Sequence, residues 1–339
     1  MSEWKQILEQ YLKMKFSDKR GLSITRLDKL RDGWESDNYL LTVEYGDRQT
    51  REDWVWRIYS GAGSQVKAAR EFNSMARLRD AGYPVPGVFL LETDHSPVDR
   101  PFVIMEYLPG EVMLEMIDAA SVDRQAQLID QFCWLFVQLH DLNWKLFDES
   151  LPHDDPFFFI DRWLDDACGV TRNFPDVDAS SFLEWVAARR EVFACPRPSP
   201  AHQDFHPGNI LVSADDSATV IDWTNFAVTD SRFDLAWTLV LAHAHGWQGM
   251  RDQILQGYQR HAGKPVEQIE SFEAIACARR LFDLTISLTL GAQRMGMNAQ
   301  AVESMREGME AHRHVHRLFV ERTGLSIRAF DDLFGIANN

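Results

Sequence analysis

The sequence predicts an α+β fold of two lobes, and three observations support this class. The chain has 339 residues, which is more than one hydrophobic core usually organises. Strand-like alternation of apolar and polar residues dominates roughly the first hundred residues, whereas apolar residues at helical spacing dominate the part after residue 108. We therefore expect an N-terminal nucleotide-binding lobe over residues 1–107, with a five-stranded antiparallel sheet and a helix. A mainly helical C-terminal lobe over residues 108–339 should follow it.

Patterns along the N-terminal lobe predict its elements in order. Residues 1–16 alternate charged and apolar residues in the manner of an amphipathic helix. Alternation with a period of two follows, and it returns near the end of the lobe. The expected strands cover residues 23–30, 37–45, 53–59, 88–92 and 102–105.

A helix is expected over residues 64–81, between the third and fourth strands. Ser64 is a common N-cap residue, and Gly82 and Pro84 are typical of a helix end. The residues expected on the inner face of this helix are Val66, Ala69, Phe72 and Met75.

A dense group of polar residues lies within residues 200–237. His202-Gln203-Asp204 comes first, Asn209 follows Asp204 by five residues, and Asp222 comes after two short apolar runs with a polar turn between them. These runs predict a β-hairpin, which should bring the Asp204 loop and Asp222 to the same end. Carboxylate and amide oxygens suit Mg²⁺, which proteins usually bind together with the phosphates of a substrate. The motif therefore predicts a magnesium and nucleotide site.

This stretch, HQDFHPGNIL followed by VIDW, resembles the aminoglycoside phosphotransferase family, which is similar in turn to choline, homoserine and macrolide kinases. The resemblance covers most of residues 20–240 and implies a bilobal protein-kinase-like fold. It also implies transfer of the γ-phosphoryl group of ATP or GTP to a small-molecule hydroxyl, with Asp204 as base and Asn209 and Asp222 as magnesium ligands. Gln203 departs from the family, whose members typically carry Gly there. Judged alone, Asp204 and Asn209 could also be turn residues that cap the backbone.

The resemblance further implies nucleotide-binding residues in the N-terminal lobe. Arg57 takes the place of the third-strand cation, usually Lys, that grips the phosphates, and Glu71 takes that of its helix partner. The alternatives are an exposed strand arginine and a solvated helix glutamate. A glycine turn would cover the phosphates, unless it is an ordinary hairpin turn, and backbone groups after the last strand would bind the base. The implied residues are Gly33, Ser36, Arg57, Glu71, Glu106, Tyr107 and Leu108.

Helices dominate the predicted C-terminal lobe. A helix over residues 122–142 should pack beneath the catalytic loop, and Asp234 resembles the family's aspartate that braces this loop. His312, His314 and His316 could chelate a metal from one helix, but no Glu-x-x-His motif or cysteine accompanies them, so we expect structural histidines. Further helices are expected over residues 235–245, 250–262, 266–297, 299–322 and 327–334.

The acceptor is expected to contact residues 142–200, where the family varies with its substrate. This segment is rich in aromatic and acidic residues. Asp154, Asp155 and Asp161 favour a cationic acceptor, attracted by the field of several carboxylates. Aromatic residues such as Trp163 and Trp185 favour instead a large apolar acceptor of the macrolide kind.

Composition limits the partners and the location. The formal net charge of −16 argues against nucleic acid and anionic membranes as partners, because both need clustered Lys and Arg. The four cysteines lie far apart without a C-x-x-C pair, which favours reduced thiols. The sequence shows neither a signal peptide nor an apolar run of membrane-spanning length. We therefore expect a cytoplasmic protein.

Two other functions are compatible with these motifs. A nucleotide-binding pseudokinase would act as a sensor; Arg57 favours it, whereas intact Asp204, Asn209 and Asp222 do not. A protein kinase would need a surface for peptides, and the chain has no Ala-Pro-Glu segment or long activation loop before Asp234. The favoured function is a magnesium-dependent kinase that uses ATP and acts on a small molecule.

Overall fold

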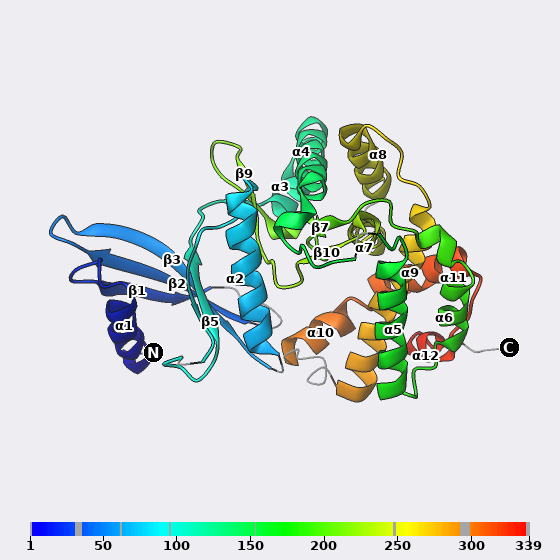
Figure 1. Cartoon of the computed structure of the whole chain (residues 1–339), viewed down its shortest axis with the longest axis horizontal. Coiled ribbons are helices and arrows are strands. Elements are labelled where there is room, and N and C mark those ends of the chain that lie inside the picture. Colours follow the sequence, from blue (N-terminus) through cyan, green and yellow to red (C-terminus); the bar gives the residue numbers. More distant parts are fainter. Residues whose placement is uncertain are drawn as a thin grey trace. The chain divides into compact units, whose positions relative to one another are not determined.

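The chain forms two compact units (Figure 1). The first contains Met1–Glu111 and Ile210–Asn225, and the second contains Val112–Asn209, Phe226–Met295 and Ala299–Asn339. The predicted α+β class is confirmed, because one unit is built on a five-stranded sheet and the other is mainly helical. The structure is a computed structural model and describes residues 2–30, 36–61, 63–94, 96–152, 154–246, 249–291 and 299–336.

An antiparallel sheet of five strands forms the centre of the first unit, as predicted. Its order is β1-β2-β3-β5-β4, so β3 pairs with β2 on one side and with β5 on the other. Trp54, Trp56 and Ile58 of β3 are buried on one face, where α1 (Ser2–Lys15) contributes Leu8 and Leu12 to the same core. The strands are β1 (Ser23–Lys29), β2 (Ser36–Tyr45), β3 (Thr50–Tyr59), β4 (Val88–Glu92) and β5 (Phe102–Glu106).

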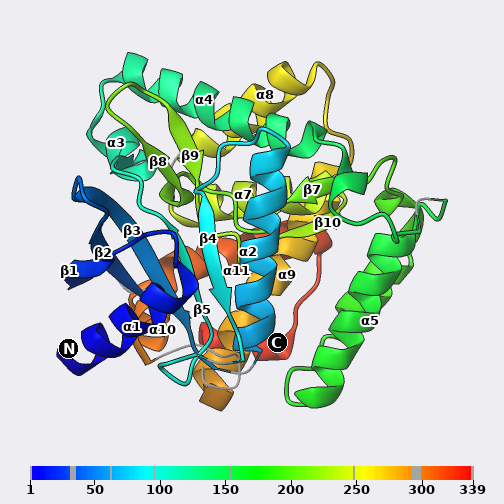
Figure 2. The same cartoon turned by 60° about the vertical axis from the view of Figure 1, so that its left-hand side comes forward.

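Helix α2 (Ser64–Asp80) packs against β3, β4 and β5 (Figure 2). Its inner face is only partly the predicted one: Met75 is buried as expected and Ala69 and Phe72 are half-buried, but Val66 is 61% exposed. Ser64 is not the N-cap either, since Gly63 holds that position in a left-handed backbone that glycine adopts readily. Apolar spacing misplaced the face because two of its buried members are polar. The buried residues are Ala68, Glu71, Ser74, Met75 and Leu78.

The predicted hairpin after the Asp204 loop is present and belongs to the first unit. Strands β8 (Ile210–Val212) and β9 (Ala218–Val220) pair antiparallel, with Ile210 opposite Val220. Ile210, Val212 and Val220 are buried, as their apolar character leads one to expect.

Helices α7 (Ser231–Ala244), α9 (Ile269–Ile286) and α11 (Met309–Thr323) pack against one another in the second unit. Helix α4 (Val122–Asp141) packs against α8 (Met250–Ala262) and buries the apolar residues Leu128, Phe132, Leu135, Phe136 and Leu139. Strands β7 (Ser199–Ala201) and β10 (Ala227–Thr229) pair antiparallel beside α4 and α7. The other helices are α3 (Met113–Ala119), α5 (Phe158–Asn173), α6 (Ser180–Ala187), α10 (Ala299–Glu307) and α12 (Arg328–Leu333).

Three predicted helices differ from the observed ones by more than one residue at an end or by a division. Helix α7 begins earlier, at Ser231, because the Asp230 side chain accepts a hydrogen bond from Arg232 N and caps it. The helix expected over residues 266–297 begins at Ile269, becomes a π-helix over Ser287–Gly291, and from residue 292 lies outside the described residues. The helix expected over 299–322 is divided at Gly308 into α10 and α11. No helix in the described ranges is both long and apolar enough to cross a bilayer.

Candidate active site

The loop that carries Asp204 is held by Asp234 of helix α7. The Asp234 carboxylate accepts hydrogen bonds from the backbone N–H groups of His202, at 2.6 Å, and Gln203, at 2.9 Å. It is fully buried and also lies 3.3 Å from His140 Nε2. Hydrogen bonds to an ionised carboxylate are stronger than neutral ones. The bracing contact expected of Asp234 is therefore present.

Gln203 adopts a left-handed backbone, with φ of 67°. A residue other than glycine in this region carries a strain of about 1 kcal/mol or more. This strain is the physical reason why a glycine suits the position and why Gln203 stands out in the motif. The bonds from Asp234 to the loop offset the strain and keep Asp204 in place.

The Asp204 carboxylate is oriented by Trp237, a residue that the sequence pattern did not indicate. Trp237 Nε1 donates to Asp204 Oδ1 at 2.8 Å, and His206 Nε2 lies 3.8 Å from Oδ2. Asn209 Nδ2 donates to the Asp204 carbonyl oxygen at 3.0 Å, so these two predicted site residues lie together. Trp237 follows Asp234 by three residues on α7, and residues at this spacing share a helix face. That spacing is the signal by which Trp237 could have been found.

Arg57, Glu71 and Asp222 form a second cluster, within the first unit. Arg57 Nε lies 3.2 Å from Glu71 Oε2, so the predicted ion pair is confirmed. The Nε–H group of Arg57 does not make a hydrogen bond in this contact, so the two side chains interact here as an ion pair. Arg57 Nη2 also donates to Asp222 Oδ1 at 2.8 Å, a bond that was not predicted. Since the side chains of Arg57 and Glu71 are only 13% and 1% exposed, neither is a solvated surface residue.

Burial and charge together set the ionisation of this cluster. Glu71 accepts hydrogen bonds from the Tyr59 hydroxyl and from Trp223 N, the latter at 3.2 Å. Burial raises the pKa of Glu71, and the Arg57 charge opposes the rise. Burial lowers the pKa of Arg57, but the carboxylates of Asp222 and Glu71 outweigh this and raise it above its usual value. Arg57 is therefore a permanent cation shared by two carboxylates.

Asp222 and Asn209 offer oxygen atoms that fit a hard divalent cation. Asp222 Oδ1 accepts from Arg57 and from Thr224 Oγ1, the latter at 3.1 Å. Asn209 uses its Nδ2 as a donor to the Asp204 loop, which leaves its amide oxygen as the candidate ligand atom. A carboxylate and an amide oxygen are ligands that Mg²⁺ accepts readily. The chemistry of these residues thus fits the implied metal.

The predicted base-binding segment follows β5. Glu106 N donates to the Gly87 carbonyl oxygen at 2.7 Å, and Tyr107 N donates to that of Asp53 at 3.3 Å. Leu108 N has no hydrogen-bond partner among the residues that the structure describes. A ligand that accepts a hydrogen bond from Leu108 N would therefore displace no backbone hydrogen bond of the described residues.

Of the turn that is predicted to cover the phosphates, the structure describes only the last residue, Ser36. Ser36 begins β2 and is buried, and its hydroxyl has no hydrogen-bond partner within the described ranges. Gly33 lies outside the described residues.

The three histidines of α11 have different surroundings. His316 Nε2 bonds to Asp331 at 2.6 Å, and His314 Nδ1 lies 3.0 Å from the Ala244 carbonyl oxygen. His312 is only 4% exposed, and neither ring nitrogen has a hydrogen-bond partner among the described residues. Burial lowers the pKa of His312 to about 4, and the charges of Arg280 and His245 add to this effect. In the described part of the chain, no three His, Cys, Asp or Glu side chains are grouped as metal ligands.

We expect His312 to destabilise the protein in acid. The pKa of His312 falls from an ordinary 6.5 to about 4 on folding, so below pH 6.5 the unfolded chain binds a proton that the folded chain does not. The stability that the neutral, buried His312 ring contributes is therefore fully present above pH 6.5 and is lost as the pH falls toward 4. Between pH 7 and pH 4.5 the free energy of unfolding should therefore fall by about 2 kcal/mol less in His312→Leu than in the parent protein, as measured by urea unfolding. His314→Leu, at a more exposed site, serves as the control; equal pH dependence in His312→Leu and the parent protein would contradict the prediction.

Two of the carboxylates expected to attract a cationic acceptor have partners within the second unit. Asp161 pairs with Arg190, whose Nε donates at 2.7 Å. Asp155 accepts a hydrogen bond from Phe157 N at 2.9 Å, in the turn that precedes α5. These bonds give both carboxylates a structural role at the start of α5.

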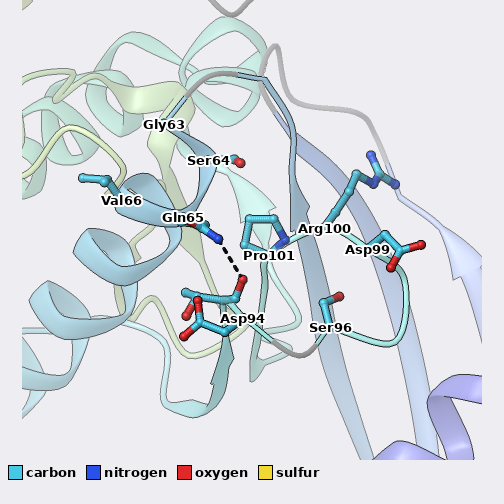
Figure 3. Close-up of a pocket in the computed structure, with 10 residues that line it drawn as sticks. Gly63, Ser64, Gln65, Val66, Asp94, Ser96, Asp99, Arg100 and Pro101 are labelled. Atoms are coloured by element: carbon cyan, nitrogen blue, oxygen red, sulfur yellow. Dashed lines mark hydrogen bonds between the residues drawn. The ribbon is translucent and has the colours of Figure 1, made fainter.

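A pocket of about 410 Å³ lies at the N-terminal end of α2 (Figure 3). Gln65 donates across it to the Thr93 carbonyl oxygen at 3.2 Å. Arg100 binds Asp37 and Ser60, both at 2.8 Å, and is thereby neutralised. None of the residues that line this pocket belongs to the motif or to the Arg57 cluster.

The fold and these two clusters define a class, the small-molecule kinases with a protein-kinase-like fold. Residues 26–268, well over half of the chain, match the family described as "Phosphotransferase enzyme family". The protein belongs to this family and is a small-molecule phosphotransferase.

Solved structures support the fold at low sequence identity. One, from Ralstonia eutropha and assigned as an aminoglycoside phosphotransferase, is 16% identical with a TM-score of 0.63, over 92% of this chain and 97% of that one. The macrolide 2'-phosphotransferase MphH of Brachybacterium faecium is 17% identical with a TM-score of 0.54, over 88% and 97%. The ethanolamine kinase of Plasmodium vivax is 15% identical with a TM-score of 0.56, over 88% and 83%. Proteins of one fold are thus named for chemically different acceptors, and the fold alone does not determine the acceptor.

Proposed function

We propose that the protein transfers the γ-phosphoryl group of a nucleoside triphosphate, most simply ATP, to a hydroxyl group of a small molecule. The observation that carries this proposal is the Asp204 carboxylate, which Trp237 orients on a loop braced by Asp234. Two structures of similar fold support a nucleotide donor: APH(2")-IIa in complex with streptomycin and ATP, 19% identical, and aminoglycoside 2'-phosphotransferase IIIa with GDP, 16% identical. Residues 1–107 would form the nucleotide-binding lobe, and residues 108–339 the catalytic and acceptor-binding lobe.

Asp204 would act as the general base. The acceptor oxygen forms a bond to the γ-phosphorus, and the bond from this phosphorus to the β,γ-bridging oxygen breaks. The electron pair of the broken bond leaves with the nucleoside diphosphate. The hydroxyl proton passes to the Asp204 carboxylate. Because Trp237 binds Oδ1, the other oxygen, Oδ2, is suited to receive the proton.

The remaining predicted site residues would bind the nucleotide. Asn209 and Asp222 would hold Mg²⁺, which when bound neutralises charge on the phosphates. Arg57 would contact phosphate oxygens, with Glu71 fixing its position. The residues that would contact the phosphates and the base are Gly33, Ser36, Glu106, Tyr107 and Leu108.

We expect Asp222→Ala to weaken the binding of MgATP by about tenfold or more, since a metal ligand is lost. Calorimetric titration with ATP and Mg²⁺, and with ATP and EDTA, measures this directly. Without Mg²⁺ the variant should bind ATP as the parent does or better, because the change also releases Arg57 from a carboxylate. Asp215→Ala, in the exposed turn between β8 and β9, should leave both titrations unchanged. The assignment fails if Asp222→Ala lowers affinity equally with and without Mg²⁺.

One observation favours a second function. The hydrogen bond from Arg57 to Asp222 puts a cation against the proposed metal ligand, which would suit a pseudokinase that binds nucleotide as a sensor. A screen of nucleotide consumption against hydroxylated metabolites and antibiotics separates the two functions. Acceptor-dependent production of nucleoside diphosphate supports the kinase, whereas nucleotide binding without turnover on any acceptor supports the sensor.

A further inference from the structure

Two consecutive arginines of α9, Arg279 and Arg280, lie near the Asp204 loop in the second unit. Arg279 of α9 donates from Nη1 to the Gln203 carbonyl oxygen at 3.2 Å, and its guanidinium carbon lies 4.1 Å from the centre of the Trp237 ring. Since Trp237 donates in turn to Asp204, a single side chain separates Arg279 from the proposed base. The Arg279 guanidinium group thus contacts both the loop that carries Asp204 and the Trp237 side chain that binds it.

Arg279 differs from other partly buried arginines of the chain in its partners. Arg57, Arg232 and Arg251 each bind at least one carboxylate within 3 Å. Among the described residues, Arg279 is bound by a carbonyl oxygen and a ring face, and it forms no ion pair. A partly buried charge without a counter-ion is unfavourable. A ligand that supplies the counter-ion would remove this cost.

Arg280, the next residue, adds to the positive charge beside Asp204. Burial lowers the pKa of Arg280, and the nearby carboxylates of Asp283 and Asp204 oppose this change. His312 and His245 lie close enough to Arg280 that its charge lowers the pKa of both. Asp283 and Asp204 both act on Arg280, so among the described residues Arg279 has no carboxylate of its own.

Two buried polar groups near this cluster have no hydrogen-bond partner within the described ranges. One is the amide nitrogen Nε2 of Gln203, the residue whose carbonyl oxygen binds Arg279, and the other is the imidazole of His312. The amide nitrogen is a donor, and a neutral imidazole has one N–H to donate. Buried donors are normally satisfied, so their natural complement is a ligand rich in acceptor oxygens.

We propose that Arg279 and Arg280 recognise an anionic group of the acceptor, a carboxylate or a phosphate, so that the preferred acceptor is a hydroxylated acid. The planar guanidinium group of arginine matches the oxygens of both anions in pairs. This inference rests on the proposed kinase function. It differs from the cationic acceptor that Asp155 and Asp161 favoured, and both of those carboxylates have structural partners.

The test compares acceptors that differ only in charge. One series consists of gluconate, gluconamide and glucamine; a second pairs glycerol 3-phosphate with glycerol, so that carboxylate and phosphate are examined separately. Initial rates with MgATP give kcat and KM for each compound, within a broader panel of hydroxylated metabolites. We expect an acid to be the best acceptor, with kcat/KM about tenfold or more above its neutral analogue and the amine the poorest of its series.

Variants then connect this preference to the two arginines. Arg279→Gln and Arg280→Gln should raise KM for the acid by about tenfold with little change in kcat or in KM for the neutral analogue. Arg279→Lys, which keeps the charge, should recover part of the loss, and the exposed Arg317→Gln should have no effect. If a Gln variant fails to fold, the comparison of acid, amide and amine in the parent protein still shows whether an anionic acceptor is preferred. A neutral or cationic best acceptor, or an equal loss for acid and amide, overturns the inference and leaves the kinase function standing, whereas no transfer to any compound overturns both.

Discussion

Asp204→Asn should lower kcat by about 10²-fold or more, the usual effect of losing a general base. The asparagine retains an oxygen that can accept the Trp237 hydrogen bond, so the loop should keep its conformation. Asn209 binds the backbone carbonyl of residue 204 and not its side chain, so this contact should also survive. Steady-state kinetics with the best acceptor, together with calorimetric titration of MgATP, measure the two effects separately. The Kd for MgATP should change by less than about threefold, a small fraction of the loss in turnover.

The matched control is Asp332→Asn, which removes one carboxylate charge from an exposed position that pairs with Arg328. It should leave kcat and the thermal midpoint of unfolding unchanged, because exposed ion pairs contribute little. If Asp204→Asn retained near-normal turnover while folded, the base would have to be another group, and His206, 3.8 Å from the Asp204 carboxylate, would be the first to examine.

Local features of the sequence predicted much of the fold. Trp54, Trp56 and Ile58 occupy alternate positions of β3, and all three are buried as expected for one face of a strand. The hairpin after Asn209 was predicted for the same reason, since two short apolar runs and a polar turn are a short-range signal. The spacing of Asp204, Asn209 and Asp222 identified the family because it reports a loop geometry and not a long-range contact.

Contacts between distant residues could not be predicted in the same way. The inner face of α2 was misassigned because Glu71 is buried against Arg57 and Tyr59 of another element, and apolar spacing cannot show a buried ion pair. The link from Arg57 to Asp222 spans 165 positions in the chain. Arg279 belongs to a helix that carries no motif, so only its position over Trp237 connects it to the Asp204 loop.

The composition of residues 142–200 leaves the charge of the acceptor open for a related reason. Acidic residues in a sequence count alike, whether they face a ligand or cap a helix. Asp161 and Asp155 bind Arg190 and a backbone N–H, whereas two arginines of α9 lie near the Asp204 loop. Electrostatic character therefore has to be judged at the site and not from a segment's composition.

Arg57→Met should destabilise the first unit by about 3–5 kcal/mol, because it leaves Glu71 buried without its counter-charge. Glu71→Gln should also destabilise it, since Arg57 then keeps only Asp222 as a partner. The two changes together should cost less than the sum of the single changes, with a coupling of about 2 kcal/mol. Urea unfolding of the four proteins completes this double-mutant cycle. The control cycle uses Lys13 and Glu9, an exposed pair on α1, whose coupling should not exceed about 0.5 kcal/mol.

The pH dependence of the Arg57→Met cost tests the physical cause. Burial already raises the pKa of Glu71 and the Arg57 charge opposes that rise, so removal of Arg57 should raise this pKa further. As the pH is lowered, Glu71 in the variant takes up a proton and the cost of an unpaired buried charge disappears. The destabilisation should therefore be larger at pH 8 than at pH 5, whereas loss of packing alone would give the same value at both. Additive costs in the cycle, or a destabilisation that does not change with pH, would show that Arg57 and Glu71 act independently, and the proposed role of Glu71 in positioning Arg57 for phosphate would then be wrong.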